Sequence, residues 1–117
     1  MIQIGAASRA INGEVGALVQ GASVDNRAER IRDDMEANAL YLSDRSESVL
    51  LVSCDLAGLE AEGIAPAREA MGEAAGVPAR NVIVAATHMH SGPCVIPTNP
   101  AKPVDRAYLA RLHDGLV

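Results

Sequence analysis

Short apolar stretches, each bounded by turn residues or charges, recur along the chain and predict β-strands. Residues 2–7 open the chain and fit an edge strand. Residues 37–42 and 48–54 have the same character, and the turn-forming residues 43–47 between them predict an antiparallel hairpin. The middle of the second hairpin strand is apolar on both faces, which is typical of a central strand covered on both sides.

After the hairpin, the pattern changes from strand to helix. Residues 57–76 predict a helix that contains Pro66 and ends at Gly76, in the position of a C′ glycine, with Pro78 two residues later. Residues 81–86 then form another apolar strand. Strand, helix and strand in this order predict a βαβ unit with parallel strands and a right-handed crossover.

The remaining segments carry weaker signals. Residues 8–26 contain three glycines among scattered polar residues and predict a loop. Residues 27–36 are densely charged and predict a short surface helix or a turn. Residues 105–117 place apolar side chains at helical spacing behind Asp105, a good N-cap, and predict a last helix.

Together these elements predict an α/β fold whose mixed sheet holds a β-hairpin and a βαβ unit. The last predicted helix has no C-cap glycine or trailing loop, so we expect residues 1–117 to be an incomplete part of a larger α/β domain. The chain has no Trp or Phe and only two Tyr. Its core must therefore come from close packing of small and aliphatic side chains.

Composition and charge exclude several classes of function. Lys and Arg number 10 against 15 Asp and Glu, a net charge of −5, which with so few aromatics argues against nucleic-acid binding. Charges interrupt every apolar run well before the ~20 residues of a membrane span. No secretory signal is visible at the start, so we expect a cytoplasmic protein or one that begins after a lost leader. Cys54 and Cys94 are expected to be small buried residues rather than redox or ligand groups.

The segment Thr87–Pro93, with the sequence Thr-His-Met-His-Ser-Gly-Pro, carries the candidate chemistry. It follows strand 81–86 at its carboxyl end, where open α/β sheets place their sites. If the backbone stays extended, residues two apart point to the same side, and His88 and His90 converge on one point. Two converging imidazoles suit a divalent metal, and the alternative is a purely structural histidine pair.

Four other residues bear on this candidate site. Asp55 ends the neighbouring strand and is expected on the same rim, as a metal ligand, as a partner that orients a histidine, or as the N-cap of the following helix. Gly92 and Pro93 break the strand and let a substrate approach the backbone closely. His113, on the charged side of the last helix, is expected to be an ordinary surface histidine.

The order of these features resembles the N-terminal part of the neutral/alkaline, non-lysosomal ceramidase family. The most specific likeness is the His-x-His-Ser-Gly-Pro string, which is similar to the family's Thr-His-Thr-His-Ser-Gly-Pro motif. Weaker likenesses occur in the same order over nearly the whole chain, at residues 4–9, 33–42, 52–56 and 104–109. The resemblance implies a zinc-dependent amidase that hydrolyses the N-acyl bond of ceramide to sphingosine and a fatty acid.

By that resemblance His88 is a zinc ligand, and His90 lies beside the metal, where it contacts substrate or assists proton transfer. Asp55, Ser91 and Gly92 lie on the rim of the active site. The family completes its zinc site with a further histidine, a glutamate and a tyrosine far downstream, beyond this chain. Because a catalytic zinc needs three protein ligands, we expect residues 1–117 alone to be inactive.

Two positions depart from the family's pattern. Met89 replaces the middle threonine of the motif and is expected to face away from the metal, and Asn38 stands where the family usually has an arginine. Two alternatives to a ceramidase therefore remain. One is a related hydrolase that acts on a different amide or ester, and the other is a non-catalytic α/β module whose histidines bind metal.

Overall fold

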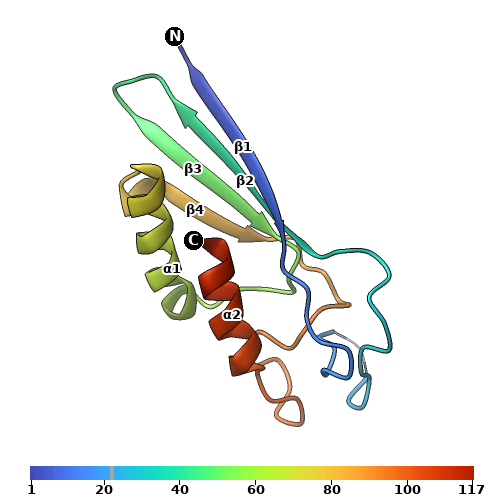
Figure 1. Cartoon of the computed structure of the whole chain (residues 1–117). Helices are drawn as coiled ribbons and strands as arrows, with labels where there is room; N and C mark the ends of the chain where they lie inside the picture. Colours follow the sequence, from blue (N-terminus) through green and yellow to red (C-terminus); the bar gives the residue numbers. More distant parts are fainter. Residues whose placement is uncertain (22) are drawn as a thin grey trace.

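The computed structural model describes residues 1–21 and 23–117, which form a mixed four-stranded sheet with two α-helices packed on it (Figure 1). The strand order is β1-β2-β3-β4, and only the β3–β4 pair is parallel. The elements are β1 Gln3–Ala10, β2 Glu36–Ser43, β3 Ser48–Cys54, α1 Ala61–Ala75, the short 3₁₀ helix Ala79–Asn81, β4 Val82–Ala86 and α2 Arg106–Leu116. The predicted α/β class, with its hairpin and βαβ unit, is confirmed.

The hairpin of β2 and β3 pairs in full register from Ser43 with Ser48 to Ala37 with Cys54. Its turn is held by Asp44, whose carboxylate accepts hydrogen bonds from the backbone N–H groups of Ser46 and Glu47, both at 2.9 Å. The Ser46 hydroxyl donates to the same carboxylate at 2.7 Å. These bonds, led by the one from Glu47, lower the pKa of Asp44 to about 2.

The βαβ unit also forms as predicted, with a shorter helix. Helix α1 begins at Ala61 rather than at residue 57, because the backbone of Leu56 and Ala57 is used to bind the loop after β4. It ends at Gly76, whose φ of 65° is left-handed, the conformation that favours glycine at a C′ position.

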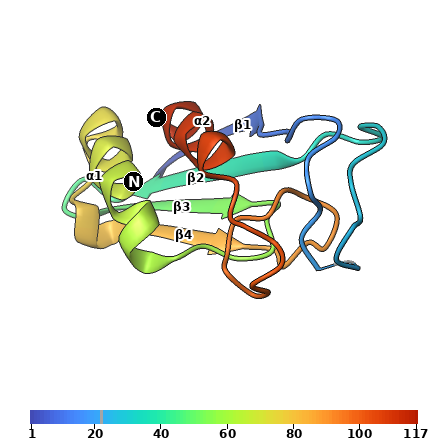
Figure 2. The same cartoon turned by 90° about the horizontal axis from the view of Figure 1, so that it is seen from below.

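Both helices lie on one face of the sheet, as Figure 2 shows. The core lies between that face and the helices and includes Val52, Val82, Met71, Tyr108 and Leu112. The opposite face is uncovered, and Ile4 and Ile83 on it are 70% and 55% exposed. The expectation that residues 48–54 would be covered on both sides is therefore wrong within the described residues.

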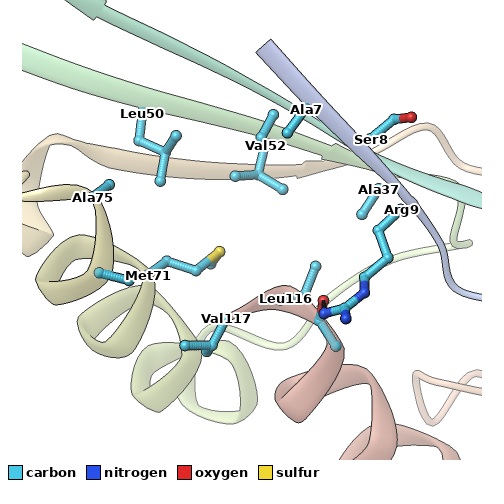
Figure 3. Close-up of a pocket in the computed structure, with 13 residues that line it drawn as sticks. Ala7, Ser8, Arg9, Ala37, Leu50, Val52, Met71, Ala75, Leu116 and Val117 are labelled. Atoms are coloured by element: carbon cyan, nitrogen blue, oxygen red, sulfur yellow. Dashed lines mark hydrogen bonds between the residues drawn. The ribbon is translucent and has the colours of Figure 1, made fainter. Parts of the chain in front are cut away.

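An apolar gap of about 410 Å³ separates the middle of the sheet from the ends of the two helices (Figure 3). Leu50 and Val52 line it from the sheet, Met71 from α1, and Leu116 from α2. At its edge the Arg9 guanidinium donates to the Gly115 carbonyl oxygen at 2.8 Å. The small residues Ala7, Ala37 and Ala39 leave this space open, so the close packing expected of a core without Trp or Phe is not reached here.

The long connections gather at the end of the sheet to which the arrows of β3 and β4 point (Figure 1). Residues 27–35 contain no helix; they run as bends and irregular backbone with mostly exposed charged side chains, so the turn alternative is the better description. The predicted loop 8–26 begins later than expected because β1 continues to Ala10. Asp105 caps α2 as predicted, accepting from the Tyr108 N–H at 2.9 Å.

Within the described residues, no helix has the length and apolar character of a membrane span. Cys54 and Cys94 are both buried and unpaired, as predicted. Burial raises the pKa of the Cys54 thiol to about 11, and the neighbouring Asp55 charge adds to this shift. Neither thiol is suited to redox or ligand chemistry in the folded chain.

Candidate functional site

The site is built where the parallel strands β3 and β4 end side by side. Cys54 pairs with Ala86 in the last row of the ladder, and the Thr87 N–H continues it by donating to the Cys54 carbonyl oxygen at 3.0 Å. Beyond that row the two segments stay in contact, since the Met89 N–H donates to the Leu56 carbonyl oxygen at 3.1 Å. Asp55 and Thr87 are therefore neighbours at the carboxyl edge of the sheet, where the strand order predicts a site.

Asp55 holds this edge together. One carboxylate oxygen accepts from the Glu36 N–H at 3.0 Å, and the other accepts from the Thr87 hydroxyl at 3.2 Å. The side chain thus ties β2 to the loop that carries the histidines. The predicted place on the rim agrees with this position, but the N-cap alternative is wrong, because α1 begins at Ala61 behind Glu60. Asp55 also makes no hydrogen bond to either His88 or His90 within the described residues.

His88 leaves the strand in a left-handed conformation, with a φ of 66°, which is uncommon for a residue with a Cβ. The turn directs the imidazole toward the segment before α1, where Nδ1 lies 2.7 Å from the Ala57 carbonyl oxygen. A carbonyl oxygen only accepts, so Nδ1 must carry the proton and donate. In the neutral ring, Nε2 is then left unprotonated, which is the form a metal ligand requires.

His90 meets His88 at that same Nε2 atom. The two Nε2 atoms are 3.2 Å apart, and the rings are arranged edge to face with centroids 4.7 Å apart. The predicted convergence therefore occurs, but not through continued extended backbone. Strand β4 ends at Ala86, and the left-handed turn at His88 brings the two rings together.

The donor set fits part of a zinc site. Two nitrogens bound to one tetrahedral zinc at ~2.0–2.1 Å lie roughly 3.3–3.4 Å apart, close to the observed separation of His88 and His90. No group of three or more His, Cys, Asp or Glu side chains capable of holding a metal occurs among residues 1–21 and 23–117. The described residues thus offer at most two of the ligands that a catalytic zinc needs.

The residues on either side of His90 line a cavity of about 430 Å³ together with parts of the segments 12–19 and 28–35. Ser91 is exposed on its wall, and Gly92 is buried beneath it. The terminal methyl carbons of Met35 and Met89 both lie against Gly92, where a Cβ would come within 2.8 and 2.9 Å of them. The Met89 side chain is thus packed against Met35 in this wall.

His113 lies elsewhere, on α2, where its Nδ1 atom is 3.5 Å from Oδ1 of Asp114. Its side chain is 38% exposed. It has no contact with the other two histidines and is the surface residue that the pattern predicts. Sequence reasoning missed three contributors to the site. Ala57 acts through its backbone, which no sequence pattern reveals, and Gln20 and Gly21 lie about 70 residues before the histidines, in what the sequence marks only as a glycine-containing loop.

Fold and site together define a mixed α/β unit with a histidine pair at the carboxyl end of its parallel strands. No family model and no curated protein matches the chain. The chain is similar to solved structures, however. The neutral ceramidase from Pseudomonas aeruginosa matches with a TM-score of 0.82 and 23% sequence identity, over 99% of this chain and 20% of that chain. A ceramidase complexed with C2 matches with a TM-score of 0.84 and 22% identity, over 99% of this chain and 20% of that chain.

These likenesses confirm at the level of fold the resemblance that the His-x-His-Ser-Gly-Pro string implies. The chain has the fold of one part of neutral ceramidase, and it spans about a fifth of the length of the ceramidase chains that it matches. In fold, it therefore matches part of a larger ceramidase domain.

Proposed function

We propose that this chain is the histidine-bearing part of a zinc-dependent amide hydrolase that acts on ceramide-like lipids. The observation that carries the proposal is the approach of the two Nε2 atoms to 3.2 Å at the carboxyl end of β4, in a ceramidase fold. Both histidines are exposed to solvent, and their Nε2 atoms nevertheless meet at 3.2 Å. They fit neighbours of one metal ion.

His88 is assigned as the zinc ligand because the Ala57 carbonyl holds its ring in one orientation and one tautomer. This arrangement is the usual support of a ligating histidine, whose second nitrogen donates to a backbone or carboxylate oxygen. A zinc ion at this Nε2 would polarise an amide carbonyl and make water a stronger acid.

His90 is assigned to move a proton beside the metal. Within the described residues its Nδ1 atom has no hydrogen-bond partner, and its Nε2–H donates to the unprotonated Nε2 of His88 at 3.2 Å. An imidazole that presents a proton at one nitrogen and can accept one at the other suits general acid–base work on the leaving amine. Asp55 holds the ends of β3 and β4 together, and Ser91 and Gly92 form the adjoining wall.

The 117 residues by themselves are proposed to be inactive, since they offer at most two ligands. The test uses the protein encoded by the complete reading frame, as wild type and as His88→Ala, His90→Ala and His113→Ala. Wild type is expected to hold about one zinc ion and to hydrolyse a short-chain N-acylsphingosine. His88→Ala should lose the zinc, His90→Ala should keep zinc but lose most hydrolysis, and His113→Ala should keep both.

Three results would contradict the proposal: a wild-type protein without zinc, a His90→Ala variant as active as wild type, or hydrolysis by residues 1–117 alone. If zinc is bound but only another amide or an ester is hydrolysed, the metal site stands and the ceramide assignment fails. Assaying an N-acyl amino acid and a simple ester in parallel separates these outcomes.

A further inference from the structure

We infer that Gln20 is a positioning residue that, through its neighbour Gly21, holds His90 against His88. The inference deepens the proposed function and rests on it for its catalytic consequence. Its structural content, the placement of His90, can be tested without any metal. Gln20 lies far from the histidines in sequence and belongs to none of the motifs that the sequence marks.

The Gln20 side chain is buried, only 2% exposed, and every polar atom in it is used. Its Oε1 atom accepts from the backbone N–H groups of Val95 at 2.8 Å and Ile96 at 3.3 Å. Its Nε2 atom donates to the Thr98 hydroxyl at 2.6 Å and to the Ile96 carbonyl oxygen at 3.3 Å. One amide thus binds the segment that follows the histidine motif through both its donor and its acceptor.

Backbone contacts of residues 19 and 20 also hold the segment that follows His90. The Gln20 N–H donates to the Gly92 carbonyl oxygen at 2.8 Å, two residues after His90. The preceding residue, Val19, pairs with Pro93 in an isolated bridge, and its carbonyl oxygen accepts from the buried Lys102 ammonium at 2.7 Å. The segment 19–20 is therefore fixed to the chain just beyond His90 by both side-chain and backbone contacts.

The next residue, Gly21, is held in place by these contacts and lies directly against His90. Its φ is 74°, and a Cβ added to it would lie 2.5 Å from Cγ and 2.8 Å from Nδ1 of His90. The imidazole therefore rests directly against the Gly21 backbone, with no room for a side chain between them. Since the opposite contact of the ring is the Nε2 atom of His88, His90 is held between Gly21 and His88.

Loss of a residue that holds a catalytic group in its orientation lowers the reaction rate, because the reacting atoms are then no longer held in one geometry. Gln20→Met keeps the length of the side chain and removes all four of its hydrogen bonds. Arg68→Met is the matched control. It removes side-chain hydrogen bonds to the carbonyl oxygens of Val82 and Ala79, at the opposite end of β4.

The first measurement is made on the metal-free 117-residue chain by NMR. In wild type, we expect nuclear Overhauser cross-peaks between the Gly21 α protons and the His90 β protons, and between the rings of His88 and His90. Gln20→Met should lose both, while the cross-strand peaks of the sheet remain. Arg68→Met should keep both, even where it lowers the melting temperature. Retention of both cross-peaks in Gln20→Met would overturn the inference.

If Gln20→Met loses the sheet peaks as well, Gly21→Ala decides the question. This variant leaves the Gln20 hydrogen bonds in place and puts a methyl group where the His90 ring lies, so it should lose the His88–His90 cross-peak with the sheet intact. A His88–His90 cross-peak that survives in Gly21→Ala contradicts the inference.

The second measurement is catalytic and uses the complete protein. Gln20→Met should keep its zinc and lower kcat by about 10- to 100-fold with little change in KM. Loss of the cross-peaks in a protein whose wild type holds no zinc would disprove the proposed function and leave the positioning role intact. Cross-peaks and kcat that both match wild type in Gln20→Met would disprove the positioning role and leave the proposed function intact.

Discussion

The carbonyl oxygen of Ala57 lies 2.7 Å from Nδ1 of His88 and accepts a hydrogen bond that fixes the orientation of the imidazole. Ala57 belongs to the connection between β3 and α1, so the crossover of the βαβ unit itself supports the histidine. The neighbouring Leu56 carbonyl oxygen accepts from the Met89 N–H at 3.1 Å and fixes the backbone on the other side of His88. The same short segment thus sets both the ring and the main chain of the proposed ligand.

The first prediction concerns the tautomer of this ring. Neutral His88 should carry its proton on Nδ1, because that nitrogen faces the Ala57 carbonyl oxygen, which can only accept. Long-range ¹H–¹⁵N correlation spectra of the metal-free chain distinguish the two tautomers directly. His113, whose Nδ1 lies 3.5 Å from the exposed Asp114 carboxylate and which faces no backbone carbonyl among the described contacts, serves as the comparison and should show more of the Nε2-protonated form than His88. A His88 ring protonated mainly on Nε2 would contradict the prediction.

The second prediction separates the structural and the chemical roles of Asp55. Asp55→Ala leaves the Glu36 N–H and the Thr87 hydroxyl without their acceptor, and should lower the free energy of unfolding by about 1–3 kcal/mol. Asp55→Asn can still accept from one of the two groups and should cost less than half as much. Urea denaturation of the three proteins measures both changes. Equal losses for Ala and Asn would show that the carboxylate charge, rather than hydrogen bonding, is what the site needs.

Hydrophobic periodicity and the residues that form turns and helix caps predict most of the fold, because these sequence signals are local. The hairpin, the C′ role of Gly76 and the N-cap role of Asp105 each depend on residues within a few positions of one another, and the βαβ unit follows from the order of three such local elements. The errors lie where tertiary contacts decide. Helix α1 begins four residues later than its pattern because the backbone of Leu56 and Ala57 binds the histidine loop instead.

The site was predictable in its residues but not in its geometry. The position of His88 and His90 after an apolar strand indicates a site at the sheet edge, and the two rings do meet there. How they meet depends on the positive φ of His88 and on Gly21, which lies 69 positions before His90 and contacts its ring. Contacts over such sequence distances leave no periodic trace in a single sequence.

A third prediction tests the hydrogen bond that joins α2 to Ile11, the residue that follows β1. The buried Tyr108 hydroxyl donates to the Ile11 carbonyl oxygen at 2.6 Å, and burial raises the pKa of this phenol above its usual range. Tyr108→Phe leaves that carbonyl unsatisfied and should cost about 1–3 kcal/mol of unfolding free energy. Tyr41→Phe is the control. The Tyr41 hydroxyl makes no hydrogen bond within the described residues, so its loss should change stability by less than about 0.5 kcal/mol.

The fourth prediction concerns acid stability and the hairpin turn. The N–H of Glu47, followed by the hydroxyl and N–H of Ser46, lowers the folded-state pKa of Asp44 to about 2, from 3.8 when unperturbed. A carboxyl group with a lowered pKa stabilises the fold above its unfolded pKa, and this contribution is lost as the pH falls from about 4 toward 2. Asp44→Ala should therefore destabilise the chain clearly at about pH 6 and much less near pH 2.5, as measured by urea denaturation at each pH. Asp44→Asn, which keeps an acceptor oxygen but cannot titrate, should retain part of the turn and show a flatter acid profile than wild type. A loss in Asp44→Ala that is the same at both pH values would mean that the carboxylate charge contributes nothing to the turn.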